Sequence, residues 1–155
     1  MTGIGWLGLV GGDMKRDVLP EQREAAMQQL RDVGLRVTGP RLEVLKVLRE
    51  NDHMEVEEIT STARERLGTL TSQAVYEMLK HFLDTGLVTK FDRPGLPAVF
   101  ELASEPHHHA LCTRCGRVAN VDVQAPTPSR KGLHGWHVMG AELVFKGECP
   151  DCRQS

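Results

Sequence analysis

Four cysteines in two closely spaced pairs are the residues of this sequence whose chemistry is clearest. Cys112 and Cys115 form one Cys-x-x-Cys pair, Cys149 and Cys152 form the other, and the 155-residue chain contains no further cysteine. Two residues between thiolates allow a tight turn to aim both sulfurs at one tetrahedral Zn²⁺, and two such turns complete its shell. Two disulfides are the alternative, but Cys-x-x-Cys bridges are mostly redox devices and nothing in the sequence suggests export. We therefore expect a closed, structural zinc site with no open position for catalysis.

A second group of metal-ligating residues precedes the first cysteine pair. His107, His108 and His109 are consecutive, and in an extended segment residues i and i+2 point to the same side. His107 and His109 therefore form a pair of imidazole ligands, and Glu101 can add a carboxylate oxygen to them. His53 can act as a further ligand that connects this site to the N-terminal half of the chain. Such a donor set suits Fe²⁺, Mn²⁺, Zn²⁺, Co²⁺ or Ni²⁺, and the order of affinities does not select among them. The alternative is a solvated histidine-rich linker.

The composition is that of a globular chain with a mainly aliphatic core, since 40% of its residues are hydrophobic and only 5% are aromatic. A formal net charge of −2 excludes a general attraction to nucleic acid or membrane, so DNA binding would need a local surface. Residues 1–12 are apolar and glycine-rich, without a basic leader or cleavage site, and are too short to span a bilayer. We expect a flexible extension over residues 1–19, with Met14 as an alternative start, and a cytoplasmic protein that does not enter membranes.

Helical periodicity and helix-ending glycines predict four helices in the first half of the chain. They cover residues 21–33 and begin again near Pro40, Glu55 and Thr71. Two strands, residues 87–91 and 98–102, follow and are joined by an Asp-Arg-Pro-Gly turn. This order of elements is typical of a winged helix-turn-helix.

In such a fold the exposed face of the last helix enters the major groove and the hairpin touches phosphate. Near the start of that helix Ser72 and Gln73 can reach base edges, while Tyr76 can contact a thymine methyl or a phosphate. The residues we expect to contact DNA are Arg41, Ser72, Gln73, Tyr76, Lys80, Lys90 and Arg93. Acidic residues slightly outnumber basic ones between Glu21 and Gly95, so electrostatics do not support this expectation. The alternative is a small helical bundle with a solvated polar face.

The C-terminal third reads as a small sheet. Short strands are expected at residues 110–112, 117–123 and 143–147, whereas residues 130–140 have no clear pattern. A segment of this size buries little core alone, so zinc and a partner chain are the expected supplements. The predicted class is α+β. Its parts are a winged-helix DNA-binding domain over 20–102, a linker at 103–106 and a metal-binding α/β dimerisation domain over 107–155.

Several of these motifs together resemble one known family. They are Leu-Arg-Val-Thr-x-Pro-Arg at 35–41, a histidine before the third helix, Ser-Gln-Ala-Val-Tyr at 72–76, Gly-Leu-Val at 86–88, Phe-Glu-Leu at 100–102, His-x-His-x-x-Cys-x-x-Cys-Gly at 107–116 and the closing Cys-Pro-Asp-Cys. In this order they resemble the ferric uptake regulator family, over roughly Gln22 to Cys152. Gln-Ala-Val-Tyr followed by an acidic residue, and Val-Ala-Asn-Val-Asp at 118–122, are similar to the actinobacterial, peroxide-responsive branch that controls catalase-peroxidase genes.

The resemblance implies a homodimeric, metal-dependent repressor that binds an inverted repeat in double-stranded DNA. It implies a structural Zn²⁺ on the four cysteines. It also implies a regulatory metal, Fe²⁺ or Mn²⁺ with Zn²⁺ and Ni²⁺ as alternatives, on His53, Glu101, His107, His109 and a carboxylate five residues past Cys115. That last position is Asn120 here, whose amide oxygen is a weaker ligand, and Asp122 on the same strand face is the substitute. Because the missing carboxylate helps to make bound iron reactive in peroxide sensors, Asn120 argues against peroxide sensing. Glu77, where many members carry Arg, is a second departure.

Three functions therefore compete. The first is a metal-switched repressor of oxidative-stress or metal-homeostasis genes, in a peroxide-sensing form or as an iron- or zinc-responsive uptake regulator. The second is a metalloenzyme in which histidines and Glu101 hold a catalytic Zn²⁺, although no general base has a recognisable spacing. The third is a zinc-stapled adaptor that binds another protein and has negligible affinity for DNA. We rank them in this order.

Overall fold

The structure is a computed structural model that describes residues 20–105, 107–124 and 132–154, and the chain divides into two compact units between residues 37 and 38. The first unit contains α1 (Pro20–Asp32), whose buried residues are Ala26 and Leu30. The helix ends in a turn in which Leu35 N donates to Leu30 O over 2.8 Å, and Gly34 supplies the positive φ of 73° that this turn requires. The extension predicted over residues 1–19 lies outside the described residues.

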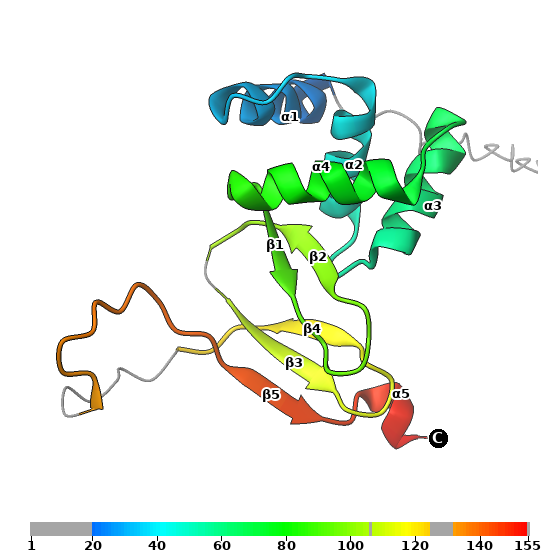
Figure 1. Ribbon diagram of the computed structural model, residues 1–155. Coiled ribbons are helices and arrows are strands. Elements are labelled where there is room, and N and C mark those ends of the chain that lie inside the picture. Colours follow the sequence, from blue (N-terminus) through cyan, green and yellow to red (C-terminus); the bar gives the residue numbers. More distant parts are fainter. Residues whose placement is uncertain (1–19, 106, 125–131, 155) are drawn as a thin grey trace, which may run out of the picture. The chain divides into compact units, whose positions relative to one another are not determined.

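The second unit begins with three helices and a hairpin, as the sequence predicted (Figure 1). These elements are α2 (Gly39–Glu50), α3 (Val56–Leu67), α4 (Ser72–Asp84), β1 (Val88–Phe91) and β2 (Val99–Leu102). Local chemistry explains where the helices start. Thr71 accepts a hydrogen bond from Ala74 N over 3.2 Å at the start of α4, and Glu58 accepts one from Glu55 N over 2.8 Å at the start of α3.

The core of this unit lies between the three helices and the hairpin. Its fully buried side chains include Val44, Leu45, Val47, Leu48, Ile59, Val75, Leu79, Phe82 and Val88. The buried face of α4 consists of Val75, Met78, Leu79 and Phe82, whereas Leu83 is half-buried. The opposite face of α4 carries the polar residues, as amphipathic patterning predicts.

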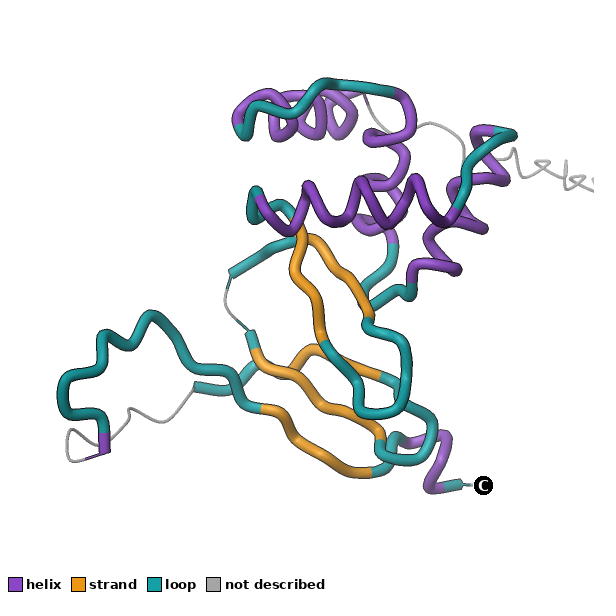
Figure 2. The backbone as a smooth tube through the Cα atoms, in the orientation of Figure 1, coloured by secondary structure: helices purple, strands orange, loops and turns teal. Residues whose placement is uncertain are grey.

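A three-stranded sheet follows the hairpin, with strand order β4-β3-β5. Its strands are β3 (His108–Cys112), β4 (Val118–Val121) and β5 (Val144–Gly147), and β3 pairs antiparallel with β4 and parallel with β5. A short helix that the sequence did not predict, α5 (Pro150–Arg153), carries the last cysteine. Within this second unit, Figure 2 shows the hairpin strands lying between helices α2 to α4 and this sheet. The fold is α+β, as expected, and the division at residues 103–106 stays a prediction.

We expect Phe82→Ala to lower the free energy of unfolding by about 3–5 kcal/mol, because it leaves a cavity where a fully buried ring packs. Tyr76→Ala on the same helix is the matched control. Its side chain is 52% exposed, so its effect is expected to stay within about 0.5 kcal/mol. Urea unfolding of the zinc-loaded protein, followed by far-UV circular dichroism, measures both. Equal losses would contradict the assignment of the buried face.

Candidate metal centres

One buried carboxylate gathers three histidines from different parts of the chain. The ligand atoms of His53, Glu101, His107 and His109 all lie within 4.8 Å of one another. His107 Nε2 lies 3.0 Å and His109 Nε2 lies 3.3 Å from Glu101 Oε1, while His53 Nε2 lies 3.1 Å from Glu101 Oε2. The structure therefore brings together the four residues that the sequence singled out, although His53 and His109 are 56 positions apart.

Backbone pairing explains how His53 reaches this carboxylate. Its neighbour Met54 forms an isolated antiparallel bridge with Phe100, with N···O distances of 3.0 and 2.8 Å, and Phe100 precedes Glu101 on β2. His53 has a φ of 55° and is the only non-glycine residue with positive φ among the described residues. A left-handed conformation costs roughly 1–2 kcal/mol in an L-residue, and such strain is concentrated at functional sites.

The geometry of the cluster fits a divalent cation. The side chains of His53, Glu101 and His109 are 6%, 5% and 8% exposed. Although His53 Nε2 is close to Glu101, the contact lacks the angles of a hydrogen bond, and this buried nitrogen has no other partner among the described residues. A buried polar atom without a partner is costly, and a cation held between the imidazoles and the carboxylate would satisfy it. Three nitrogens and one carboxylate oxygen match the preferences of first-row transition metals.

The protonation state of Glu101 also suits a ligand. Burial raises the pKa of this carboxyl, but the close contact with His53 and the charges of His53, His107 and His109 outweigh it and lower the pKa to about 2. Thr89, the cross-strand partner of Glu101, adds a hydrogen bond from its hydroxyl over 3.2 Å. The group is therefore an ionised carboxylate at neutral pH.

Three residues that surround the cluster were not predicted from the sequence. Thr89 faces Glu101 in register, and the Phe91 ring lies 4.7 Å from the His109 ring. The carboxylate of Glu142 contacts His109 Nδ1 over 2.8 Å. None of the three was among the predicted site residues. Hairpin register is the signal that would have found Thr89, whereas Glu142 stands 33 positions after His109 with no motif to connect them.

Asn120 and Asp122, the two candidate ligands on β4 and just after it, do not lie in the cluster as the histidines do. Asn120 is the cross-strand partner of His109 and is exposed. Asp122 is also exposed, lies past the end of β4 and is not part of the cluster that the described residues form. The structure therefore does not bring a carboxylate from this strand to the site.

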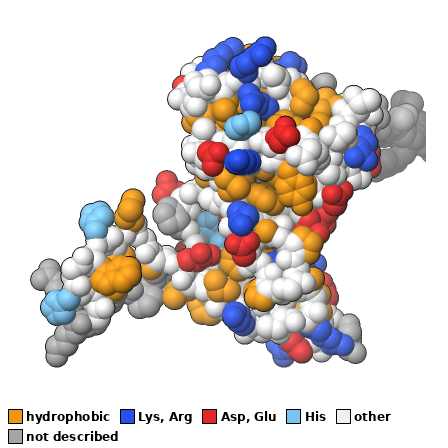
Figure 3. Space-filling model, viewed as in Figure 1, with side chains coloured by type: hydrophobic (Ala, Val, Ile, Leu, Met, Phe, Trp, Pro, Cys, Tyr) orange, Lys and Arg blue, Asp and Glu red, His pale blue; other side chains and the backbone are white. Residues whose placement is uncertain are grey.

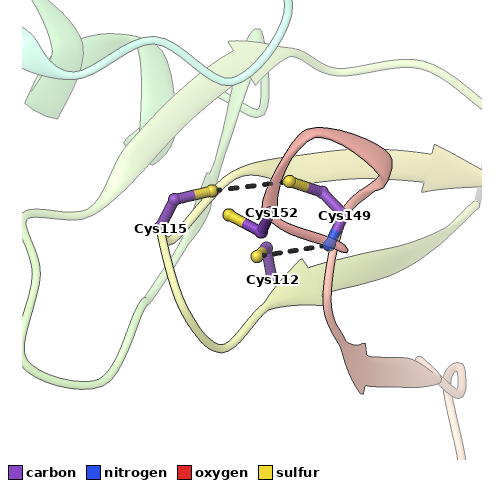
Figure 4. Close-up of side chains that lie close together, drawn as sticks. All are labelled: Cys112, Cys115, Cys149 and Cys152. Carbon is purple, nitrogen blue, oxygen red and sulfur yellow. Dashed lines mark hydrogen bonds between the residues drawn. The ribbon is translucent and has the colours of Figure 1, made fainter. Parts of the chain in front are cut away.

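The four cysteines form the second cluster, with all sulfurs within 4.8 Å of one another (Figure 4). Cys115 Sγ and Cys149 Sγ are 3.7 Å apart, well beyond the length of a disulfide, and all four thiols are free. Cys112 ends β3, and the turn after it closes through Gly116 N donating to Cys112 O over 2.9 Å. Cys149 precedes the first turn of α5, which carries Cys152.

The pKa values of this cluster show thiols that compete for ionisation. Backbone N–H groups of Cys115 and Cys149 lower the pKa of Cys112 to about 6, and Cys149 N lies 3.3 Å from its sulfur. Hydrogen bonds with Cys149 and Cys115 raise the pKa of Cys152 to about 12. Four sulfurs this close cannot all ionise without a cation, and the tetrahedral Cys₄ set is the one that structural Zn²⁺ uses.

The residues expected to contact DNA are distributed over one exposed helix face and the hairpin. Gln73, Tyr76 and Lys80 are exposed on α4, as predicted. Ser72 and Gln73 are held by carboxylates, since Ser72 Oγ donates to Glu57 over 2.9 Å and Gln73 Nε2 donates to Glu77 over 3.2 Å. Figure 3 shows basic, acidic and apolar side chains intermingled on this face without a continuous basic patch. Arg41 is half-buried at the start of α2, and Lys90 pairs with Asp92 over 3.0 Å.

Arg93 has a different environment from the one expected of a phosphate contact. Its side chain is 9% exposed and pairs with Glu55. It also donates from Nη1 to the carbonyl of Gly116 over 2.9 Å and from Nε to that of Pro97 over 2.9 Å. The guanidinium thus joins the hairpin turn to the start of α3 and to the turn that carries Cys115. This geometry disfavours a role for Arg93 in DNA contact, and that role stays a prediction.

Helices and a hairpin joined to a small sheet, with two clusters of metal-ligating side chains, are the arrangement expected of a metal-binding winged-helix protein. The model of the ferric uptake regulator family matches residues 32–145. The transcriptional regulator FurA of Mycobacterium tuberculosis is 36% identical over 129 residues, which cover 81% of this chain and 88% of that protein.

Two solved structures extend the likeness. The ferric uptake regulator of Vibrio cholerae has a TM-score of 0.66 at 32% identity, covering 79% of this chain and 98% of that one. The ferric uptake regulator of Pseudomonas aeruginosa, solved with manganese, has a TM-score of 0.61 at 28% identity, covering 81% and 98%. The chain belongs to the ferric uptake regulator family and is a metal-dependent, DNA-binding transcriptional regulator. This membership sets aside the metalloenzyme and the adaptor. In the described part of the chain no helix is long and apolar enough to cross a membrane.

Gly116 provides a test of the contact between the cysteine turn and the hairpin turn. It has a φ of 75°, and a Cβ added there would lie 2.1 Å from Leu96 Cδ1. Gly116→Ala therefore incurs backbone strain of about 1–2 kcal/mol and in addition displaces Leu96, which raises the expected loss of stability to about 2–3 kcal/mol.

Gly95→Ala is the matched control, because Gly95 has the same φ of 75° with open space around it. Only the backbone strain is expected for it. Urea unfolding together with zinc content per chain measures both variants. If the two glycines cost the same, the hairpin turn does not pack on the cysteine turn in solution.

Proposed function

We propose that this protein is a homodimeric repressor whose regulatory metal binds at His53, Glu101, His107 and His109, while Cys112, Cys115, Cys149 and Cys152 hold a structural Zn²⁺. The observation that carries the proposal is the origin of the ligands. His53 precedes α3 in the helical part, Glu101 belongs to the hairpin, and His107 and His109 belong to the β3 segment. A site with ligands from three elements is sensitive to how those elements are arranged.

The chain's own residues explain how such a site controls DNA binding. His53 lies three residues before the start of α3, which packs against the DNA-facing α4. Holding its imidazole against Glu101 fixes that helix pair relative to the β3 sheet. A bound cation supplies the attraction that favours this closed arrangement, and a coupling of about 1–3 kcal/mol changes operator affinity from several-fold to about a hundredfold. Without the cation, the buried Nε2 of His53 lacks a hydrogen-bond partner, and the contact between the loop before α3 and Glu101 is weaker.

Dimerisation is supported by the edge of the sheet. β5 pairs with β3, is exposed at all four positions and carries Val144 and Phe145, which are 39% and 47% exposed. An exposed edge strand with apolar side chains is a template for pairing with another chain. A two-fold dimer presents two α4 helices, which matches an operator with an inverted repeat.

We favour Fe²⁺ or Mn²⁺ as the regulatory metal because of the family likeness, which includes the Pseudomonas aeruginosa regulator solved with manganese. Zn²⁺ and Ni²⁺ are the alternatives, since imidazole ligands suit them as well. The motifs at 73–77 and 118–122 that resemble the actinobacterial, peroxide-responsive branch support control of oxidative-stress genes such as catalase genes. The absence of a carboxylate from β4 at the site supports the second candidate, an iron- or zinc-responsive uptake regulator without peroxide sensing.

His53→Ala tests the switch. We expect the parent protein to bind an inverted-repeat operator at least tenfold more tightly with Mn²⁺ than without it, and the variant to lose this response while keeping its zinc. His134→Ala is the control, because His134 is exposed and lies outside both clusters. Fluorescence anisotropy of labelled operator DNA measures the affinities. Metal-independent binding by the parent protein would refute the switch.

Aerobic loading with Fe²⁺ followed by peroxide separates the two candidate regulators. A peroxide sensor gains one oxygen on the peptide that carries His107 or on the one that carries His53, and it releases the operator. A plain uptake regulator stays bound and unmodified when iron is present. Peptide mass spectrometry together with the same anisotropy assay distinguishes them.

Lys80→Ala tests the DNA-facing side of α4. If Lys80 contacts a phosphate, the substitution weakens binding to operator and non-operator DNA alike and reduces the slope of log affinity against log salt by about 1. Arg153→Ala is the control, because it removes an equal charge from an exposed position in α5, at the C-terminal end of the second unit. The slope should not change for this variant. An unchanged slope for Lys80→Ala would exclude this residue from the interface.

A further inference from the structure

Glu142 contacts the metal cluster from outside, through the far side of an imidazole. Its Oε1 lies 2.8 Å from His109 Nδ1, while Nε2 of the same ring points to Glu101. A carboxylate can only accept, so Nδ1 donates this hydrogen bond, and Nε2 is the ring nitrogen that can bind a cation in the cluster. Glu142 lies just before β5, far in sequence from every other residue of the site.

His107 provides a comparison within the same cluster. Its Nε2 also points to Glu101, and its Nδ1 lies 3.0 Å from the backbone carbonyl of Glu105. Both rings therefore present Nε2 inward and Nδ1 to an oxygen. The difference is charge, because the oxygen beside His107 belongs to a neutral carbonyl and the oxygen beside His109 belongs to a carboxylate.

The charge matters because the inner set is poor in anions. Imidazoles bind a metal in their neutral form, so three of them and one carboxylate would place a single negative charge against a divalent cation, and Asn120, opposite His109, is an uncharged amide. A carboxylate hydrogen-bonded to a ligating histidine makes that imidazole more basic and transfers part of its negative charge to the metal. Glu142 thereby supplies a second negative charge, which acts on the metal through the hydrogen bond to His109 and not by direct coordination.

The backbone around Glu142 holds it in this position. His109 N donates to Leu143 O over 3.1 Å, and Leu143 N donates to His108 Nδ1 over 3.2 Å. Immediately afterwards, Val144 pairs with His109 as β5 begins. The side chain of Glu142 is 52% exposed, so its contact with His109 depends on this backbone anchoring and not on burial.

We propose that Glu142 is a positioning residue of the regulatory metal centre: it orients His109 and supplies the negative charge that Asn120 does not. The inference rests on the metal site proposed above. It adds that the strength of metal binding depends on the attachment of the segment before β5 to β3.

Co²⁺ titration of zinc-loaded full-length protein, followed by the visible absorption of the bound ion, tests the proposal. Glu142→Gln keeps the size of the side chain and removes its charge, and Glu142→Ala removes both. We expect Co²⁺ affinity to fall about tenfold for Glu142→Gln and by up to about 100-fold for Glu142→Ala, the range seen when such partners are removed. The absorption maxima should change little, because Glu142 is not itself a ligand.

Glu105→Gln is the matched control. Glu105 lines the same recess beside the cluster as Glu142, but it meets His107 through its backbone carbonyl. Its affinity for Co²⁺ should stay within about twofold of the parent. A second measurement is the ¹H–¹⁵N spectrum of the imidazoles in protein with Zn²⁺ at both sites, in which the slowly exchanging Nδ1–H of His109 should be present in the parent and lost in Glu142→Ala.

The outcomes separate this inference from the proposed metal site. If the parent binds Co²⁺, His109→Ala abolishes that binding and Glu142→Gln matches Glu105→Gln, the role of Glu142 is overturned and the metal site stands. If Glu142→Ala shifts the absorption maxima strongly, Glu142 is a direct ligand and the positioning role is overturned. If the parent binds no Co²⁺ beyond the cysteine site, both proposals fail.

Discussion

The contact on which the rest of this structure depends is the buried carboxylate of Glu101 with three imidazole nitrogens around it. An ionised group with 5% exposure is expensive to bury and is tolerated only where charges or donors compensate it. Here the compensation comes from the hairpin through Thr89, from the loop before α3 through His53 and from the β3 segment through two further histidines. Each of these elements is held against the others by its contact with one anion.

A second junction joins the same elements at the other end of the hairpin. Arg93 connects the hairpin turn to Glu55 at the start of α3 and to the carbonyl of Gly116, directly after the first cysteine pair. The cysteine cluster therefore includes the turn that ends at Gly116, which the hairpin contacts through Arg93. The histidine cluster holds the loop before α3 through the contact of His53 with Glu101. Under the proposed function the two metals would have separate tasks: the zinc would keep this support in place, and the regulatory ion would hold the loop before α3 against the hairpin and the β3 segment.

Much of the site was predictable because its signals are local or short in period. The cysteine spacing predicts a tetrahedral cluster, and alternation along an extended segment predicts that His107 and His109 share a side; the structure shows both arrangements of side chains. Asp122 was predicted by the same alternation, but β4 ends before it and it does not join the cluster. Arg93 was expected to face phosphate on charge alone, and its partners are internal. Charge indicates what a side chain can bind, whereas packing decides what lies within its reach.

The sequence by itself determined the two sets of ligands, the order of helices and hairpin, and the family, because residue types, spacings and helix-capping residues are properties of neighbours in the chain. Only the tertiary structure decided that Glu142 approaches His109, that Gly116 supports the hairpin, and that His53 adopts a left-handed conformation to reach Glu101. These contacts join residues up to 48 positions apart through strand pairings and a parallel connection to β5. No local pattern encodes such pairings, since they follow from the free energy of packing the whole unit.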